Sequence, residues 1–346
     1  MKKIKKEHGI TLVALVITIV ILLILAGISI QAIMNTGLFE QVEEAKKKTE
    51  NAQIEENEIL ENYYEQMTSY GVGKQSSAEE TASTTHTAAE ITYGWDEIAN
   101  MAKVISNTTS INENTLEVKV TIDGKTKILG VGDTKTLDGK TVRILGFNHD
   151  ELADSVKTTA YGSSTLTGKA GISFEYVDFL TSAQINSSAT NAGGWKDTEL
   201  RETLNGITYS SLITTYHIKK VKKDYIPTYY VASTQQTEDY LWLLSCGEIW
   251  DNGYGQDQNP IINGTRGYAI TTEGKQYKYY KINLGSISYS SSNNITKKIS
   301  ASSSNLWWLR SPNRYNSYTF CRVDSDGNCG TGDTNISRGV APGFSI

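Results

Sequence analysis

The chain has 346 residues, with 38 acidic side chains, 33 basic side chains and a formal net charge of -5. This length allows one membrane helix and one or two globular domains. Because the net charge is negative and no basic patch stands out in the sequence, composition does not favour nucleic acid as a partner.

The first notable segment is a long apolar run near the N-terminus. No charged residue occurs from Ile10 to Met34, and Ile, Leu, Val and Ala fill most positions. About 20 such residues cross roughly 30 Å of hydrocarbon as a helix, so the run predicts a single membrane span. Four lysines lie within the first six residues. The positive-inside rule then predicts a cell-membrane protein with a cytoplasmic N-terminus and an extracellular C-terminal domain.

Three interpretations of this run remain open: a cleaved signal peptide, a plain signal anchor and a prepilin leader. A signal peptide normally has an apolar core of about 7 to 15 residues. The sequence Gly9-Ile10-Thr11-Leu12-Val13, after a short basic leader, resembles the type IV prepilin and pseudopilin cleavage-methylation motif. The resemblance implies cleavage between Gly9 and Ile10, methylation of Ile10, and as partners the membrane, a prepilin peptidase and other pilin-like subunits. The position where that family usually has Glu is Ala14, which counts against assembly into a regular filament.

Two segments follow the apolar run. Apolar and small residues recur at steps of three and four from Leu38 to Met67, which predicts a long amphipathic stalk helix. Residues 68–93 have few large apolar side chains and predict a flexible linker. The predicted organisation is a leader at 1–9, a transmembrane and stalk helix at 10–67, this linker, and a globular head at 94–346.

Turn signals divide the head into short elements. Alternating residues from Leu116 to Ile122 run into Asp123-Gly124, and a second hairpin signal occurs at Asp138-Gly139. A short helix is predicted between a cap at Asp197 and a stop at Gly206.

Apolar runs predict three further strands. They lie at Leu241–Leu244, where a central strand is expected, at Leu306–Leu309 and at Gly339–Ile346. Trp307 and Trp308 are expected to point to opposite faces and to lie mostly in the core. Short strands with few helices predict an α+β head.

Several motifs of the head match a known pattern. They are Ile144 to Asp150, Trp195 with Leu200-Arg201 and Leu204-Asn205, Leu243-Leu244-Ser245 with Glu248, Trp307 to Pro312, and Gly339 to Phe344. Together they resemble a bacterial extracellular WWLRSP-type domain, similar to the C-type lectin-like variable proteins of diversity-generating retroelements. The predicted fold class is therefore α+β, with a pilin-like long helix spanning the membrane, a flexible linker and a C-type lectin-like (formylglycine-generating-enzyme-like) head.

In the proteins that the head resembles, a hypervariable ligand-binding stretch lies between the last two motifs, which here means residues 313–338. This stretch is rich in Asn, Tyr, Ser, Thr, Asp, Arg and Gly, and such side chains suit a recognition surface. An ordinary polar surface hairpin is the other interpretation. The predicted ligand-binding residues are Arg314, Tyr315, Tyr318, Arg322, Asp324, Asp326, Asn328, Thr331, Asp333, Asn335 and Arg338.

The sequence shows no catalytic constellation and no phosphate loop, so we expect no enzyme activity and no cofactor. Its three cysteines are too few for a disulfide framework. Cys246 reads as a buried small hydrophobe, Cys321 and Cys329 could pair, and no zinc spacing is present, so no metal site is expected. The predicted function is surface display of a head that binds a protein or glycan ligand for adhesion or recognition. The alternative is a structural minor pilin or pseudopilin subunit of a filament or secretion apparatus.

Overall fold

The computed structural model describes most of the chain from residue 76 onward. The described ranges are 76–162, 165–227, 233–250, 273–284, 297–300, 303–313, 316–325, 327 and 329–346, with a few positions before them. The chain divides into two compact units, Met1–Tyr70 and Gly71–Ile346. The positions described in the first unit (20, 46–49, 52, 56 and 59) are helical and exposed.

The predicted fold class is wrong. In the parts of the chain that the structure describes, no helix is both long enough and apolar enough to cross a membrane. The helices there are short, and the C-terminal region consists mainly of β-sheets, so the long pilin-like helix is not seen. Most of residues 10–67, including Ile10, lie outside the described ranges, as does Gly9. Processing at that bond and the membrane location remain predictions.

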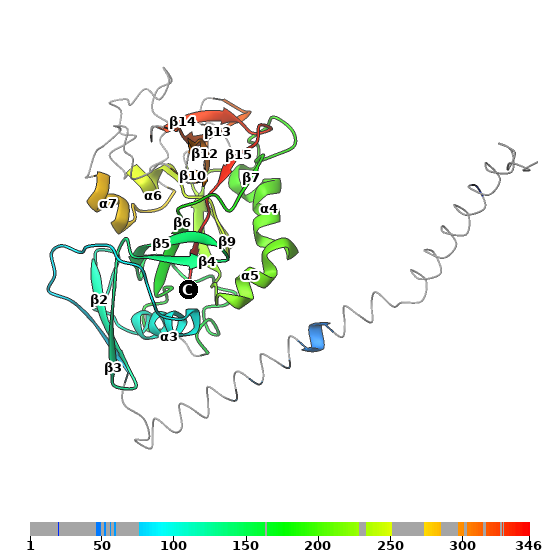
Figure 1. The fold of residues 1–346 in the computed structure, drawn as a ribbon. Helices are drawn as coiled ribbons and strands as arrows, with labels where there is room; N and C mark the ends of the chain where they lie inside the picture. Colours follow the sequence, from blue (N-terminus) through cyan, green and yellow to red (C-terminus); the bar gives the residue numbers. More distant parts are fainter. Residues whose placement is uncertain are drawn as a thin grey trace, which may run out of the picture. The chain divides into compact units, whose positions relative to one another are not determined.

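The strands of the second unit form several sheets (Figure 1). The first has the order β1 (Ser77–Glu80), β2 (Glu117–Ile122), β3 (Lys125–Gly130). The second has the order β16 (Gly343–Ser345), β6 (Ile172–Tyr176), β5 (Lys140–Phe147), β4 (Thr134–Leu137). The third has the order β14 (Cys329–Asp333), β13 (Thr319–Val323), β12 (Trp307–Pro312), β15 (Arg338–Val340), β7 (Thr181–Ala183). Two further pairs are β8 (Val221–Tyr225) with β9 (Gln235–Asp239), and β10 (Lys297–Ser300) with β11 (Ser303–Asn305).

Short helices connect these sheets. They are α3 (Trp95–Ser106), η1 (Gly194–Asp197), α4 (Glu199–Asn205), η2 (Ile207–Tyr209), α5 (Ser210–Thr215), α6 (Cys246–Trp250) and α7 (Lys278–Leu284).

Both hairpin predictions are confirmed. Asp123-Gly124 joins β2 to β3 and Asp138-Gly139 joins β4 to β5, in each case with positive φ at both turn residues. Asp-Gly favours this turn because Gly adopts positive φ without strain and Asp tolerates it. The helix between residues 197 and 206 also forms, but its N-cap is Thr198, whose side chain accepts a hydrogen bond from the Arg201 N–H.

Two strand predictions need correction. Leu241–Leu244 is fully buried but does not form a strand; Trp242 makes only an isolated bridge to Gly343. A short apolar run identifies buried chain without identifying its secondary structure. Gly339–Ile346 divides between β15 and β16, which belong to different sheets. The strand at residues 306–309 is confirmed as β12, and both of its tryptophans are fully buried, as expected.

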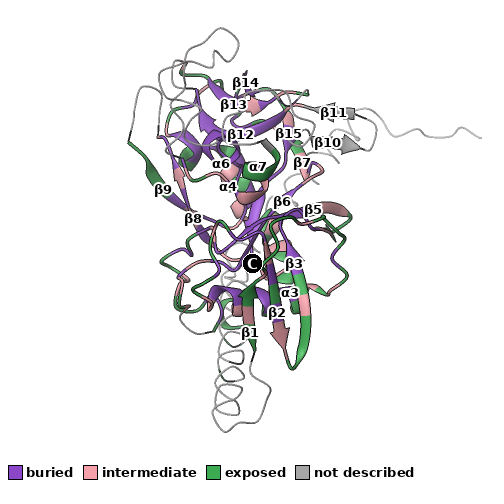
Figure 2. Ribbon diagram, turned by 90° about the vertical axis from the view of Figure 1, so that its left-hand side faces the viewer, coloured by how far each residue is buried: buried purple, intermediate pink, exposed green. Residues whose placement is uncertain are grey.

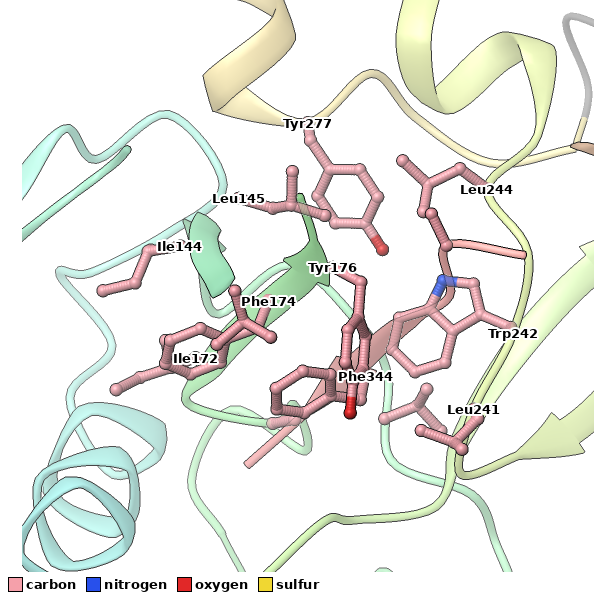
Figure 3. Close-up of a cluster of buried hydrophobic side chains, with 14 of the residues drawn as sticks. Ile144, Leu145, Ile172, Phe174, Tyr176, Leu241, Trp242, Leu244, Tyr277 and Phe344 are labelled. Atoms are coloured by element: carbon pink, nitrogen blue, oxygen red, sulfur yellow. The ribbon is translucent and has the colours of Figure 1, made fainter. Parts of the chain in front are cut away.

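The C-terminal strand β16 runs through the centre of the core (Figure 3). The ring of Phe344 stacks on Phe174 with 5.2 Å between centroids and lies 5.9 Å from Tyr176. The terminal residue Ile346 is fully buried and exchanges two backbone hydrogen bonds with Ile172. Figure 2 shows many buried residues on the strands in the middle of the domain, whereas the β2–β3 hairpin is largely exposed toward its tip.

Residues 77–93, within the predicted linker, contact the head directly. Strand β1 pairs with β2, and Glu90 bridges to Thr134. The ring of His86 lies between two carboxylates, with Nδ1 2.6 Å from Glu117 and Nε2 2.7 Å from Asp133. This segment from Ser77 onward therefore belongs to the same compact unit as the head.

The His86 clamp predicts a pH-dependent stability. Burial lowers the pKa of His86, but hydrogen bonds to Asp133 and Glu117 outweigh it and raise the pKa above its ordinary value. The interaction of protonated His86 with the two carboxylates stabilises the folded state fully below pH about 6.5, the ordinary pKa of histidine. This stabilisation is lost as the pH rises through the raised pKa of His86 in the folded state. We expect His86→Asn to lower the free energy of unfolding by about 1 to 3 kcal/mol at pH 5.5, and by less at pH 8.5, in urea titrations.

The matched control is His217→Asn. His217 makes an exposed pair with Asp96 and has a φ of 56°, a conformation that Asn tolerates. Its effect should stay within about 0.5 kcal/mol at both pH values. An equal loss at both pH values in the His86 variant would contradict the charged clamp.

Candidate ligand-binding face and the adjoining buried network

The predicted ligand-binding residues fall into different environments. Arg314, Tyr315, Asp326 and Asn328 lie outside the described residues. Tyr318 and Asp333 are exposed, whereas the remaining ones are half-buried: Arg322, Asp324, Thr331, Asn335 and Arg338. Assignment of these eleven residues to ligand binding remains a prediction.

The half-buried charges on the β13–β14 hairpin, and Arg338 at the start of β15, have partners within the domain. Arg322 pairs with Asp324 at 2.7 Å and donates from Nε to the Thr331 carbonyl at 2.6 Å. The guanidinium of Arg338 lies 5.0 Å from the ring centroid of Trp308. Gly332 in β14 gives it space, because a Cβ there would lie 2.7 Å from the Arg338 Nε.

Three loops meet at one end of this hairpin. We define the loop face as residues 187–189, 316–318 and 333–337. Buried Thr334 joins all three: its N–H donates to the Tyr318 carbonyl at 3.1 Å, and its hydroxyl donates to the Ser188 carbonyl at 3.1 Å. Buried Asn191 holds the middle loop, donating from its backbone to the Ser317 carbonyl at 2.8 Å and from its side chain to the Asn316 carbonyl at 2.5 Å. The loops are therefore fixed from inside while their outer side chains stay exposed.

The loop face carries exposed apolar groups of a kind that is uncommon on polar loops. Tyr318 is 47% exposed and Ile336 is 48% exposed. Asp333, also exposed, lies three residues before Ile336 in the chain and pairs with Thr319, the residue after Tyr318, in the β13–β14 register. An aromatic ring, an aliphatic side chain and a carboxylate thus project from the same set of pinned loops.

The fully buried guanidinium of Arg310 lies shortly before the middle loop of the loop face in the chain. Every N–H of Arg310 has an acceptor, at 2.5 to 2.9 Å: both Glu248 carboxylate oxygens and the backbone carbonyls of Asp224, Leu243 and Glu273. Glu248 is also buried, and its carboxylate forms a second ion pair with the Lys223 ammonium, with 2.5 Å between Nζ and Oε1.

Lys223 extends this network to the second sheet. Its ammonium lies 2.7 Å from Asp150 and 4.4 Å from the ring centroid of Trp242. Asp150 also accepts hydrogen bonds from Ser173 at 2.6 Å and Tyr277 at 2.9 Å. Burial opposes ionisation of Asp150, but Lys223, His149 and the hydrogen bond from Ser173 together outweigh it and hold the pKa of Asp150 well below its ordinary value. The carboxylate is therefore charged in the core.

Glu273 lies at the other side of Arg310. Its carboxyl accepts a hydrogen bond from the Ile226 N–H at 2.6 Å and contacts the Ser311 hydroxyl. Burial raises the pKa of Glu273 to about 8, so the group is mainly neutral at pH 7. The buried network then holds two cations, Arg310 and Lys223, against two carboxylates, Asp150 and Glu248.

Ser311 connects this network to a cluster of cysteines. The Cys246 N–H donates to the Ser311 Oγ at 3.0 Å. Cys246, Cys321 and Cys329 are buried, and their Sγ atoms all lie within 4.8 Å of one another. Burial raises the pKa of the Cys246 thiol, but hydrogen bonds from Cys321, Cys329 and Ser311 outweigh it and lower the pKa well below its ordinary value. These are the residues in the described part of the chain that could hold a metal ion.

Sequence reasoning missed both buried groups. Glu248, Arg310 and Ser311 belong to the motifs singled out in the sequence, but those motifs were interpreted as a frame for a variable stretch. A charged residue inside an apolar motif such as Trp-Trp-Leu-Arg is the signal that could have identified the network, because a buried charge needs a buried partner. The cysteine cluster brings Cys246 to Cys321 and Cys329, which lie 75 and 83 residues further along the chain, so local spacing could indicate only the Cys321–Cys329 pair.

The network predicts a large effect of a conservative substitution. In Arg310→Lys an ammonium with three N–H groups replaces a guanidinium with five, which leaves buried acceptors unpaired. We expect the free energy of unfolding in urea to fall by about 2 to 4 kcal/mol. The control is Lys119→Arg, whose side chain is 47% exposed, and it should change stability by less than about 0.5 kcal/mol. Similar small effects of both substitutions would show that the guanidinium geometry is unimportant.

Comparison with known proteins gives one result. No curated protein and no solved structure matches the chain. Residues 167–346, just over half of the chain, match the model of a family described as "Domain of unknown function (DUF6273)". This region includes the loop face, Glu248, Arg310 and the three cysteines, and the chain therefore belongs to the DUF6273 family.

Proposed function

We propose that this domain recognises a protein ligand through the loop face. The observation that carries the proposal is the exposure of Tyr318 and Ile336 on loops that buried Asn191 and Thr334 hold in place. Side chains presented by a fixed backbone lose little freedom on binding, so more of the contact energy appears as affinity. Functional surfaces are commonly loops positioned by a rigid scaffold.

The chemistry of the face favours a protein over a glycan. An aliphatic side chain such as Ile336 gains free energy by removing apolar surface from water, and protein partners supply such surface. Tyrosine is enriched at the centres of protein interfaces, where its ring and hydroxyl both find partners. Asp333 adds a charged group at the edge, where it favours partners with a complementary positive charge. The ligand is therefore expected to present an apolar spot beside a basic residue.

The face predicts how binding responds to substitution. Tyr318→Ala should weaken binding by at least about 30-fold, the effect of losing roughly 2 kcal/mol at an interface centre. A surface protein is first captured by crosslinking the wild-type chain to intact cells. Biolayer interferometry then measures the dissociation constant of this protein for each variant. Ile207→Ala is the matched control, because Ile207 is an apolar residue that is 79% exposed but lies outside the loop face.

Equal affinity in the Tyr318 and Ile207 variants would exclude the loop face as the contact surface. Treating the target cells separately with protease and with periodate distinguishes the ligand classes. Loss of binding after protease alone is expected, whereas loss after periodate alone would point to a glycan.

The retroelement resemblance leads to a separate prediction. If the stretch is diversified, deep sequencing of its codons across a cell population should find substitutions at adenines in codons of exposed residues such as Ser317, Tyr318 and Asp333. Inward residues such as Phe320 and Cys321 should stay fixed, because both are fully buried. A near-copy of the stretch should lie nearby in the DNA. A uniform sequence without such a copy would contradict diversification and leave a fixed binding face.

A further inference from the structure

The three cysteines of the chain converge from different elements. Cys321 lies in β13 and Cys329 begins β14; because Cys329 is paired with Val323, the two cysteines lie on the same face of the hairpin as diagonal neighbours. Cys246 begins α6 and brings its Sγ to 3.9 Å from that of Cys329. These are all the cysteines in the sequence. A helix and two strands thus place every thiol of the protein at one buried point.

The spacing of the sulfur atoms fits a shared ion. Thiolates bind zinc at about 2.3 Å, which places sulfur atoms about 3.8 Å apart around a tetrahedral ion and about 4.0 Å apart around a trigonal one. The Cys246–Cys329 distance is 3.9 Å, and no pair exceeds 4.8 Å. A disulfide requires a bond of about 2.05 Å. It would need the sulfurs to approach by almost 2 Å, and it would leave the third thiol alone.

The surroundings of the cluster suit metal-bound thiolates. Ser311 accepts a hydrogen bond from the Cys246 N–H and is itself fixed by Glu273, so it holds the backbone of one ligand residue. The guanidinium of Arg310 acts electrostatically on Cys246 and offsets part of the negative charge that several thiolates bring. Partners of this kind orient ligand residues and tune metal sites.

We propose that Cys246, Cys321 and Cys329 bind a single thiophilic d¹⁰ metal ion, Zn²⁺ or Cu⁺, as a structural site. Soft sulfur ligands select these ions over calcium and magnesium. Three thiolates complete the shell of Cu⁺, whereas Zn²⁺ adds a solvent molecule as fourth ligand. Because the thiols are buried, the ion enters as the domain folds, and it joins α6 to the β13–β14 hairpin.

The test is metal content and coordination of the full-length chain. The chain is produced with added zinc or with added copper under reducing conditions, dialysed against EDTA and analysed by mass spectrometry for metal. The expected result is close to one ion per chain in one of the two preparations, and the preparation that retains metal identifies the ion. Cys321→Ala and Cys329→Ala should each retain less than a tenth of this amount. Val323→Ala, which alters the same face of β13 but keeps every thiol, should retain it.

X-ray absorption on the wild-type chain keeps the test decisive if the cysteine variants do not fold. It should show three sulfur ligands at about 2.3 Å. A folded wild-type chain without stoichiometric metal, and with a melting temperature that neither ion raises, would overturn the proposal. A mass 2 Da below that of the reduced chain, showing a disulfide, would overturn it as well. Loss of the metal site would leave the binding test of Tyr318 unaffected, since the two readouts are independent.

Discussion

The fold of the C-terminal region depends on the burial of one guanidinium. Arg310 takes acceptors from the end of β8, from the segment of residues 243–248 and from Glu273, and it is fully buried. An unpaired charge in such a place costs several kcal/mol, so these three segments must all reach Arg310 for the domain to be stable. The register of β12 against β13 shifts between Trp308 and Pro312, and shifts of this kind re-aim side chains. The irregular register of β12 therefore helps to direct the Arg310 side chain toward its acceptors.

The same strand positions the groups that follow Arg310 in the chain. Ser311, the next residue, fixes the start of α6 through the Cys246 N–H, and Asn313, two residues further, pairs its N–H with the Thr319 carbonyl at 3.0 Å. The cysteine cluster and the middle loop of the face thus follow directly from how β12 is held. A substitution of Arg310 would therefore be expected to move both.

The sequence predicted local structure better than it predicted which distant segments pack against one another. Asp123-Gly124 and Asp138-Gly139 identified their turns because the required backbone conformation is encoded in two adjacent residues. Strand alternation predicted that Trp307 and Trp308 point to opposite faces, and both are fully buried, as expected. The long N-terminal helix was inferred from apolar length and a motif, and among the residues that the structure describes no helix is long and apolar enough to cross a membrane. The Arg310 network and the cysteine cluster depend on residues tens of positions apart, and nothing in local spacing reveals which distant segments pack together.

The predicted binding stretch divides into two parts with different physical roles. On the hairpin itself, Gly330 and Gly332 leave room for Asp324 and Arg338, where a Cβ would approach within 2.9 and 2.7 Å respectively. Arg322 is paired with that same Asp324, so these charges serve mainly to hold the hairpin. Side chains already engaged in this way must break their contacts before they can bind anything else, whereas Tyr318, Ile336 and Asp333 project from pinned loops. Specificity is therefore expected to depend on the loop ends, whereas the Arg322–Asp324 ion pair helps to hold the hairpin between them.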